Sequence, residues 1–304
     1  MFEIPEIEIY LYFFLRLLTK GQETRAVKYK MKSQSYRIIT TDDSTSSLYS
    51  EEYDEVMHST SGAYEESLFK HVYPSKILEK RNRKIAVLDI GFGLGYNVLA
   101  LITEFLKNPI SQHLNIVSLE KESDYAPHMR KIEFSDERNY IYNKIKQSFF
   151  LKQKLITDMY SFEIITGDAR NTIKAIKDTT FDAIFHDPYS PSKNPELWSV
   201  EIFQEIQRLA TDTCILTTYS SAPQIRMALI KAGFRLGKGP SLGKKREGTL
   251  ATISGGIDFL GATDLNTLEN DIKSTPYRDD QLCNSRKKIL NQRINEMRVK
   301  RSKD

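Results

Sequence analysis

Cysteine is scarce in this sequence, with two residues, Cys214 and Cys283, among 304. They lie far apart, so the chain has neither a disulfide framework nor a cysteine-rich zinc cluster, and we expect no metal. Two cysteines can still form one bridge, but their scarcity fits a reducing compartment. We therefore expect a cytoplasmic protein.

A membrane-length apolar run is also missing near the start. The run IYLYFFLRLL is too short to span a bilayer, and it contains Arg16. It follows three glutamates and has no basic leader, so a signal peptide is not expected. We interpret the run as an edge strand or a packing helix and expect no membrane partner.

The chain has no strong excess of positive or negative residues. The chain has 44 Lys and Arg against 40 Asp and Glu, a formal net charge of +4. This mildly basic balance permits a nucleic-acid partner without requiring one. With 304 residues, 40% of them hydrophobic, the chain can bury one large core with appendages.

Strand-like and helix-like segments alternate through residues 81–255. Short, continuous apolar runs predict buried parallel strands at IAVLDIG, NIVSLE, FEIITG, FDAIFHD and CILTTY. Helical spacing occurs at 96–107, 170–177, 195–210 and 222–232. FRLGKGP and GTLATIS have no room for a helix between them, so they form an antiparallel hairpin. The predicted fold is α/β: a mostly parallel seven-stranded, Rossmann-like sheet of the class I methyltransferase pattern.

Two flanking regions complete the predicted organisation. Residues 1–80 form an N-terminal extension, with possible strands at 7–18 and 25–40 and a helix at 62–80. Residues 256–304 form a basic tail that ends in a helical stretch, SRKKILNQRINEMRVKRSKD.

A glycine-rich turn, LDIGFGLGYN, ends the first predicted parallel strand and begins a helix. Gly91, Gly93 and Gly95 allow a tight turn and close approach to a ligand. Their G-x-G-x-G spacing suits a nucleoside such as S-adenosylmethionine better than a dinucleotide. Glu120 ends the next strand, where an acid can bind both ribose hydroxyls, and Asp168 ends the one after. Asp168 can accept from the adenine amino group or cap the following helix.

The stretch HDPYSPSKNPELW follows the fourth strand and borders the same crevice. Asp187 opens it, and Pro188 and Pro191 restrict the backbone behind that carboxylate. The stretch is either a rigid cover for the cofactor or a device that holds an amine. In methyltransferases that act on amino nitrogens, similar D-P-P-Y-type loops hold the nitrogen near the methyl group.

A closer resemblance is to the methyltransferase domain of the MnmC family. It is carried by SLYSEEYDEVMHSTSGAYEES, LDIGFGLGYN, FDAIFHDPYSPSKNPELWSVEIFQEI, TTYSSAPQIRMALIKAGF, GKKREGT and TPYRDDQL. The resemblance implies methyl transfer from S-adenosylmethionine to the amine of 5-aminomethyluridine at the wobble position of tRNA. It implies no flavin here, since we find no flavin-binding oxidase segment.

The resemblance also implies roles for individual residues. The cofactor site would include Tyr49, Glu55, His58, Gly62, Glu66, Gly91, Gly93, Gly95 and Asn97, beside Glu120 and Asp168. Asp187 matches the acid at the substrate amine. Apart from the resemblance, we expect the substrate to contact the loop residues Pro188, Tyr189 and Lys193 and the basic hairpin residues Lys244, Lys245 and Arg246. His186 replaces a more apolar residue of the family, and we interpret it as a packed strand-end histidine.

Two other functions stay open at this point. A polyamine aminopropyltransferase shares the fold and an adenosyl cofactor, but it needs extra acids, and Lys193 would repel a cationic diamine. A non-catalytic RNA-binding module would use the basic segments at 244–246 and 286–303.

Overall fold

The computed structural model describes residues 36–41, 45–58, 62–81, 84–109, 113–121, 124–177, 180–241 and 247–302. Residues 34–304 form one compact unit. The possible strand at 7–18 and the basic residues 244–246 lie outside the described residues. Of the possible strand at 25–40, the structure describes β1, Tyr36–Thr40.

An eight-stranded sheet forms the centre, in the order β10-β11-β9-β8-β4-β5-β7-β6. Its strands are β4 (Lys84–Ile90), β5 (His113–Glu120), β6 (Leu155–Ile156), β7 (Tyr160–Thr166), β8 (Phe181–His186), β9 (Ala210–Thr218), β10 (Arg235–Lys238) and β11 (Thr249–Thr252). β7, β5, β4, β8 and β9 pair in parallel, whereas β10, β11 and β6 pair antiparallel. The seven predicted strands are therefore confirmed. The two-residue β6 was missed because so short a strand has no recognisable period.

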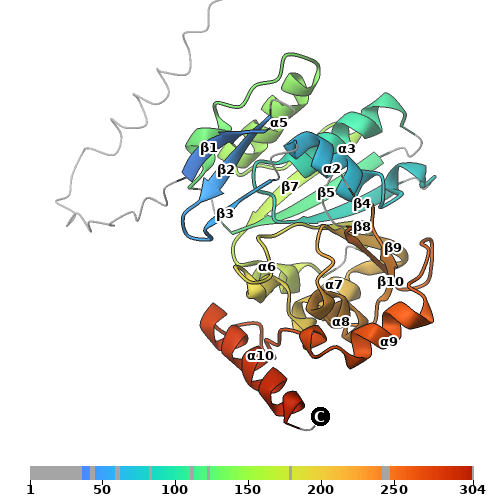
Figure 1. Cartoon of the computed structure of the whole chain (residues 1–304). Helices are drawn as coiled ribbons and strands as arrows, with labels where there is room; N and C mark the ends of the chain where they lie inside the picture. Colours follow the sequence, from blue (N-terminus) through green and yellow to red (C-terminus); the bar gives the residue numbers. More distant parts are fainter. Residues whose placement is uncertain are drawn as a thin grey trace, which may run out of the picture. The chain divides into compact units, whose positions relative to one another are not determined.

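Helices cover both faces of the sheet (Figure 1). One face carries α2 (Ala63–Ser67), α3 (Tyr96–Lys107) and α5 (Arg138–Leu151); the other carries α6 (Ala169–Ala175), α7 (Val200–Arg208) and α8 (Pro223–Lys231). β4 shows why its apolar run is continuous. Ile85 and Val87 join the hydrophobic core on the α3 face, and Leu88 and Ile90 join the core on the α8 face.

The N-terminal part contributes a small antiparallel sheet of β1, β2 (Ser46–Ser50) and β3 (Glu55–Val56). The single helix predicted at 62–80 is wrong. The segment instead forms α2, a π-helical turn η1 (Leu68–Val72) and a 3-10 turn η2 (Ile77–Glu79). Pro74 explains the break, because proline has no amide hydrogen and its ring collides with the preceding turn.

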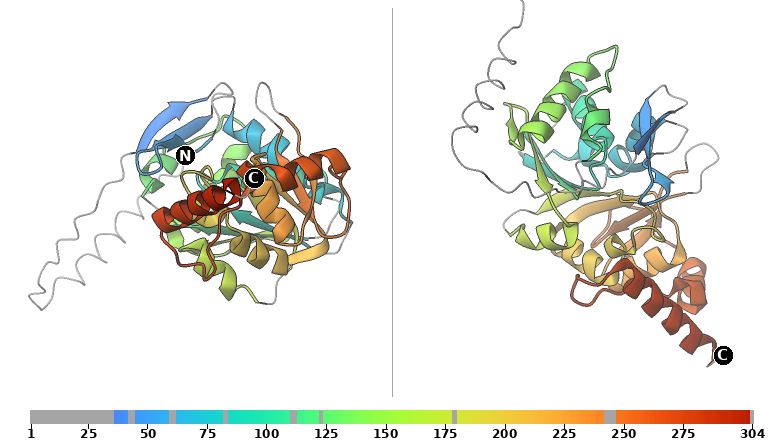
Figure 2. Two further views of the ribbon diagram at one scale, coloured as in Figure 1. Left: turned by 60° about the horizontal axis from the view of Figure 1, so that its bottom comes forward. Right: turned by 90° about the vertical axis from the view of Figure 1, so that its left-hand side faces the viewer.

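The C-terminal part packs beside the α7 and α8 side of the unit (Figure 2). It contains α9 (Ala262–Asn270), the turn η4 (Ile272–Ser274) and α10 (Arg286–Arg301), which confirms the predicted terminal helix. α4 (Ala126–Met129), α5 and α9 were not predicted, and the helix predicted at 195–210 is a 3-10 turn, η3 (Pro195–Leu197), followed by α7. Among the described helices, none has the length and apolar character needed to cross a bilayer.

Candidate active site

The sheet order places two turns side by side. β4 has β5 on one side and β8 on the other, so the chain reverses its direction of winding at this strand. Open α/β sheets bind ligands at such a switch point, outside the carboxyl ends of the strands. The turns after β4 and β8 touch there, because the Asp187 amide donates to the Ile90 carbonyl at 3.0 Å.

The glycine turn has the conformation that its sequence predicts. Gly91 has φ +92°, and a Cβ atom there would lie 2.7 Å from the Asp187 carbonyl oxygen. Gly95 has φ +79° and precedes α3, and a Cβ atom there would lie 2.7 Å from the Phe92 ring. A side chain at Gly91 would therefore push the turns after β4 and β8 apart, and one at Gly95 would displace the Phe92 ring. The Gly93 amide donates to Glu120 Oε2 at 2.9 Å, which ties the turn to the end of β5.

A pocket opens at the carboxyl edge above these turns. Eight residues predicted from the sequence line it: His58, Gly91, Gly93, Glu120, Asp168, Asp187, Pro188 and Tyr189. Ten lining residues were not predicted: Tyr53, Met57, Leu119, Lys121, Tyr125, Ala169, Arg170, Asn194, Glu196 and Leu197. The carboxylates at successive strand ends thus converge, as predicted.

A second hollow adjoins the first. It is lined by Glu55, Val56, Met57, His58, Glu66, Asp187, Pro188, Tyr189 and Tyr219. Five residues border both hollows: Met57, His58, Asp187, Pro188 and Tyr189. Asp187 therefore lies where the two cavities meet.

Among the residues that the structure describes, five predicted site residues line neither hollow. Gly62 precedes α2, and Gly95 and Asn97 lie at the beginning of α3. Tyr49 and Lys193 both contact Asp54 instead. The Tyr49 hydroxyl donates to Asp54 Oδ1 at 2.6 Å, and Lys193 Nζ lies 2.9 Å from Asp54 Oδ2.

Asp168 both caps a helix and lines the pocket. Its carboxylate accepts from the Arg170 amide at 3.0 Å at the beginning of α6 and pairs with Arg170 Nη2 at 2.7 Å. Burial alone would raise the pKa of Asp168, but the Arg170 hydrogen bonds outweigh it and hold the pKa below its usual value. The two sequence-based interpretations of Asp168 are therefore compatible.

Asp187 belongs to a buried polar network. Asn97 Nδ2 donates to Asp187 Oδ2 at 3.1 Å and to Asp89 Oδ1 at 3.3 Å, and Ser118 Oγ donates to Asp89 Oδ2 at 2.8 Å. Burial would raise the pKa of Asp187, but His71, His58 and Asn97 together lower it, so the carboxylate stays ionised. Burial raises the pKa of Asp89 to about 6 against the Ser118 and Asn97 hydrogen bonds.

Sequence reasoning missed three members of this network, Asp89, Ser118 and His71. Asp89 had a usable signal, since a lone acid within the apolar run IAVLDIG needs a hydrogen-bonding partner. His71 had none, because the residue lies in the N-terminal extension, 116 positions from its partner Asp187.

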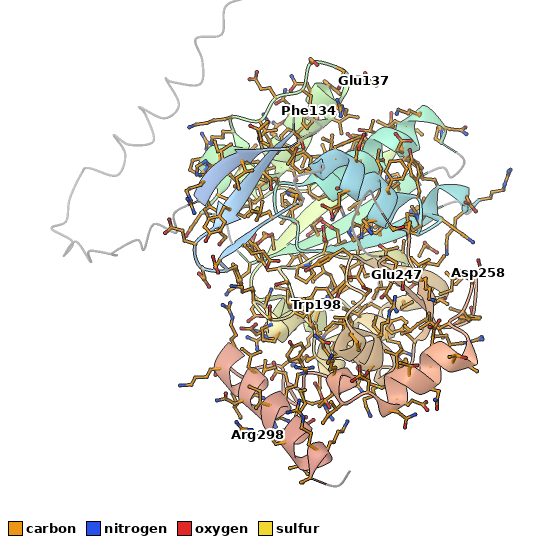
Figure 3. All side chains as sticks on the ribbon, in the orientation of Figure 1. Phe134, Glu137, Trp198, Glu247, Asp258 and Arg298 are labelled. Atoms are coloured by element: carbon orange, nitrogen blue, oxygen red, sulfur yellow. The ribbon has the colours of Figure 1, made fainter. Side chains whose placement is uncertain are left out.

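Two hydrogen bonds and a ring stack hold the loop after β8 in place, in addition to its prolines. Trp198 Nε1 donates to the Tyr189 carbonyl at 2.8 Å, and the Tyr219 hydroxyl donates to the Pro188 carbonyl at 3.0 Å. The Tyr189 ring stacks on Tyr53 at 4.0 Å. His186 is buried edge-on against Trp198, at 4.6 Å between ring centroids, and burial lowers its pKa to about 3. Trp198, labelled in Figure 3, thus holds this loop through the hydrogen bond from its indole nitrogen.

This donor set fits an adenosyl nucleoside. The glycine turn lets a ligand approach the backbone, Glu120 and Asp168 supply carboxylates, and the buried ring of Tyr125 contributes to the wall. The described residues hold no cluster of His, Cys, Asp and Glu suited to a metal ion. Fold and site together define a class I S-adenosylmethionine-dependent methyltransferase, and the bound cofactor supplies an activated methyl group.

Comparison with known proteins narrows this class. Residues 133–254 match the profile of a family described as S-adenosyl-L-methionine-dependent methyltransferases. An uncharacterized protein of Methanocaldococcus jannaschii is 30% identical over 269 residues, covering 87% of this chain and 73% of that protein. The solved structure of MnmC2 from Aquifex aeolicus is 28% identical with a TM-score of 0.79, covering 96% of this chain and 99% of that one.

The tRNA 5-methylaminomethyl-2-thiouridine biosynthesis bifunctional protein MnmC of Azoarcus sp. is 32% identical over 209 residues. The match covers 66% of this chain but 33% of that protein, so this chain spans about a third of that relative. The chain belongs to the family of the MnmC-type methyltransferases.

Proposed function

We propose that this chain methylates the amine of 5-aminomethyluridine, with or without a 2-thio group, at wobble position 34 of tRNA. The observation that carries the proposal is the position of Asp187, which lines both the cofactor pocket and the adjoining hollow. The substrate class is supported by the MnmC relatives, whose name refers to tRNA 5-methylaminomethyl-2-thiouridine biosynthesis. The partner would be the anticodon stem-loop, met in the cytoplasm.

The chemistry of amines explains why an ionised acid suits this position. A primary alkylamine has a solution pKa of about 10, so only about one molecule in a thousand is neutral and nucleophilic at pH 7. An ionised carboxylate captures the ammonium form and helps to remove its proton. Asp187 meets this need, because its lowered pKa keeps it charged.

The test uses bulk tRNA from a strain that lacks this modification. The purified chain is incubated with this tRNA and S-adenosylmethionine, and the digested nucleosides are analysed by mass spectrometry. We expect 5-aminomethyluridine to be converted to 5-methylaminomethyluridine. Alkylation of a diamine instead of tRNA, or cofactor binding without turnover, would overturn the proposal.

A further inference from the structure

Glu55 borders the second hollow from the small N-terminal sheet. It begins β3, where its backbone pairs with Ser50 of β2. Glu55 lines the second hollow, but it does not line the pocket that contains Gly91 and Gly93. Its carboxylate therefore belongs to the part of the site that adjoins the cofactor pocket, and not to the pocket itself.

The segment that carries Glu55 contacts the loop after β8 at two points. The Tyr53 ring stacks on the Tyr189 ring at 4.0 Å between centroids. Glu55 Oε2 accepts a hydrogen bond from the Ser190 amide at 2.9 Å. These contacts fix the Glu55 carboxylate relative to the loop that begins at Asp187.

The contact with Ser190 uses one oxygen of Glu55. Among the described residues, the other oxygen, Oε1, has no hydrogen-bond partner, and the residue is partly exposed. An ionised carboxylate can accept several hydrogen bonds, so Oε1 keeps its capacity to accept from a ligand. Glu55 is thus oriented by the protein and still available to a bound molecule.

The second hollow is negatively charged. Its lining includes Glu55, Glu66 and Asp187, and the described residues that line it include no Lys or Arg. The pKa of Tyr219 in the same hollow is raised by burial first and then by the charges of Glu55, Asp187 and Glu66. The three carboxylates are therefore close enough to act on one hydroxyl, and together they favour a cationic ligand.

We propose that Glu55 is a specificity-determining residue that binds the ammonium group of the substrate in the second hollow. This inference rests on the proposed function of the site. Oε1 accepts from the ammonium group, and a charge-assisted hydrogen bond of this kind is about twice as strong as a neutral one. A uridine with a neutral group at position 5 therefore binds less tightly than one with an aminomethyl group.

Glu55 and Asp187 contribute to different kinetic constants. Asp187 lines both hollows and can stay beside the amine during methyl transfer, whereas Glu55 lines only the second. An interaction that does not strengthen in the transition state lowers KM without raising kcat. Loss of the Glu55 charge should therefore raise KM more than it lowers kcat, the opposite of the split expected for Asp187.

The test compares Glu55→Gln with Glu51→Gln. Glutamine keeps an oxygen that can accept from the Ser190 amide, but it has no charge. Glu51 lies in the turn before β3, is exposed and lines neither hollow, so its variant loses the same charge outside the site. A purely structural role of Glu55 would leave its charge without effect.

Binding is measured in the presence of S-adenosylhomocysteine with two anticodon stem-loop RNAs. One carries 5-aminomethyluridine at position 34, and the other carries 5-hydroxymethyluridine. Wild type and Glu51→Gln should prefer the aminomethyl RNA, and this preference should fall about tenfold in Glu55→Gln. The affinity of Glu55→Gln for the hydroxymethyl RNA should stay close to that of wild type, which shows that the variant is folded. An unchanged preference in Glu55→Gln would overturn the proposal.

A second readout does not depend on tRNA. The free bases 5-aminomethyluracil and 5-hydroxymethyluracil are titrated into the protein with S-adenosylhomocysteine, and binding is followed by NMR. We expect wild type to prefer the amine and Glu55→Gln to lose that preference. No preference in wild type, or the same preference in both proteins, would contradict the assignment. If wild type methylates no tRNA but the preference depends on Glu55, the tRNA substrate is wrong while the ammonium-binding role stands.

Discussion

At the scale of single residues, one amide connects two acids with different properties. Asn97 Nδ2 donates to both Asp89 and Asp187, yet burial raises the pKa of Asp89 while charged and polar neighbours lower that of Asp187. Asp89 is 1% exposed within β4, whereas Asp187 lies at a pocket wall beside two histidines. Such divergent environments assign different protonation roles to neighbouring carboxyl groups.

Replacing Asp187 should impair methyl transfer far more than cofactor binding. We expect Asp187→Ala and the isosteric Asp187→Asn to lower kcat about 100-fold or more, because each lacks the charge that captures the ammonium group. The Kd for S-adenosylmethionine should change less than about threefold. Single-turnover assays and calorimetry measure the two quantities. A wild-type rate in Asp187→Asn would mean that the carboxylate only shapes the loop.

Asp89 should make the stability of the protein depend on pH. Its pKa rises from 3.8 to about 6 on folding, so the stabilisation it provides is present below pH 4 and is lost as pH rises through 6. This rise corresponds to about 3 kcal/mol of unfolding free energy. Asparagine at this position does not titrate. The unfolding free energy of Asp89→Asn minus that of wild type should therefore increase by about 3 kcal/mol between pH 4 and pH 7. Urea unfolding of both proteins across this range tests it; a difference independent of pH would contradict it.

At the scale of elements, Arg170 joins the pocket to the C-terminal part. From α6 its guanidinium pairs with Asp168 at 2.7 Å and with Asp279 at 2.9 Å, and it donates to the Asn284 carbonyl. Asp279 is 0% exposed and also accepts from the amides of Cys283 and Asn284. This contact holds the segment before α10 against the pocket-lining end of α6.

Removing Arg170 should therefore destabilise the fold. Arg170→Gln leaves the buried Asp279 carboxylate without its cation, which costs about 3–5 kcal/mol in comparable buried pairs. The matched control is Lys107→Gln, which breaks a pair with Glu104 in which the lysine is 57% exposed, and it should cost less than about 1 kcal/mol. Urea unfolding at pH 7 compares the two. Equal losses would show that the Arg170 contact contributes no more than a surface ion pair.

At the scale of the whole molecule, positive charge gathers on α10. Its exposed side chains include Lys287, Lys288, Arg298, Lys300 and Arg301, and Arg298 is labelled in Figure 3. The helix has one acid, Glu296, although the whole chain has a formal charge of only +4. An RNA substrate would be attracted by such a surface, because phosphate contacts supply most of the sequence-independent affinity.

The basic segment between β10 and β11 should also contact tRNA. The double variant Lys244→Ala, Lys245→Ala should raise KM for tRNA. The slope of the logarithm of the binding constant against the logarithm of salt concentration should become shallower by about one to two units. Cofactor affinity should not change. Truncation after Asn284 should act in the same direction.

The matched control for this charge loss is Lys107→Ala with Lys231→Ala. These exposed residues end α3 and α8, which run antiparallel to the parallel strands, so they lie away from the carboxyl edge. Binding across a salt series compares the variants. If the double variant Lys244→Ala, Lys245→Ala has the same salt slope of tRNA binding as wild type, the tRNA binds on another face.

The sequence by itself determined the sheet and the position of its crevice. Continuous apolar runs such as FDAIFHD require burial on both faces, and that requirement predicts parallel strands under two helical layers. Gly91 was predictable because a glycine-rich turn between a strand and a helix is typical of a turn where a ligand approaches the backbone. Asp187 was predictable because it directly follows a buried strand.

Only the tertiary structure decided which distant residues complete the site. His71 reaches Asp187 from a turn interrupted before Pro74, and Arg170 meets Asp279 across more than a hundred residues. Neither contact has a local pattern, because the partners are brought together by chain packing and not by the period of a helix or strand. Asp168 differs from these residues, because its position at a strand end predicted its place in the pocket, and the pairing of β5 with β7 brings it there.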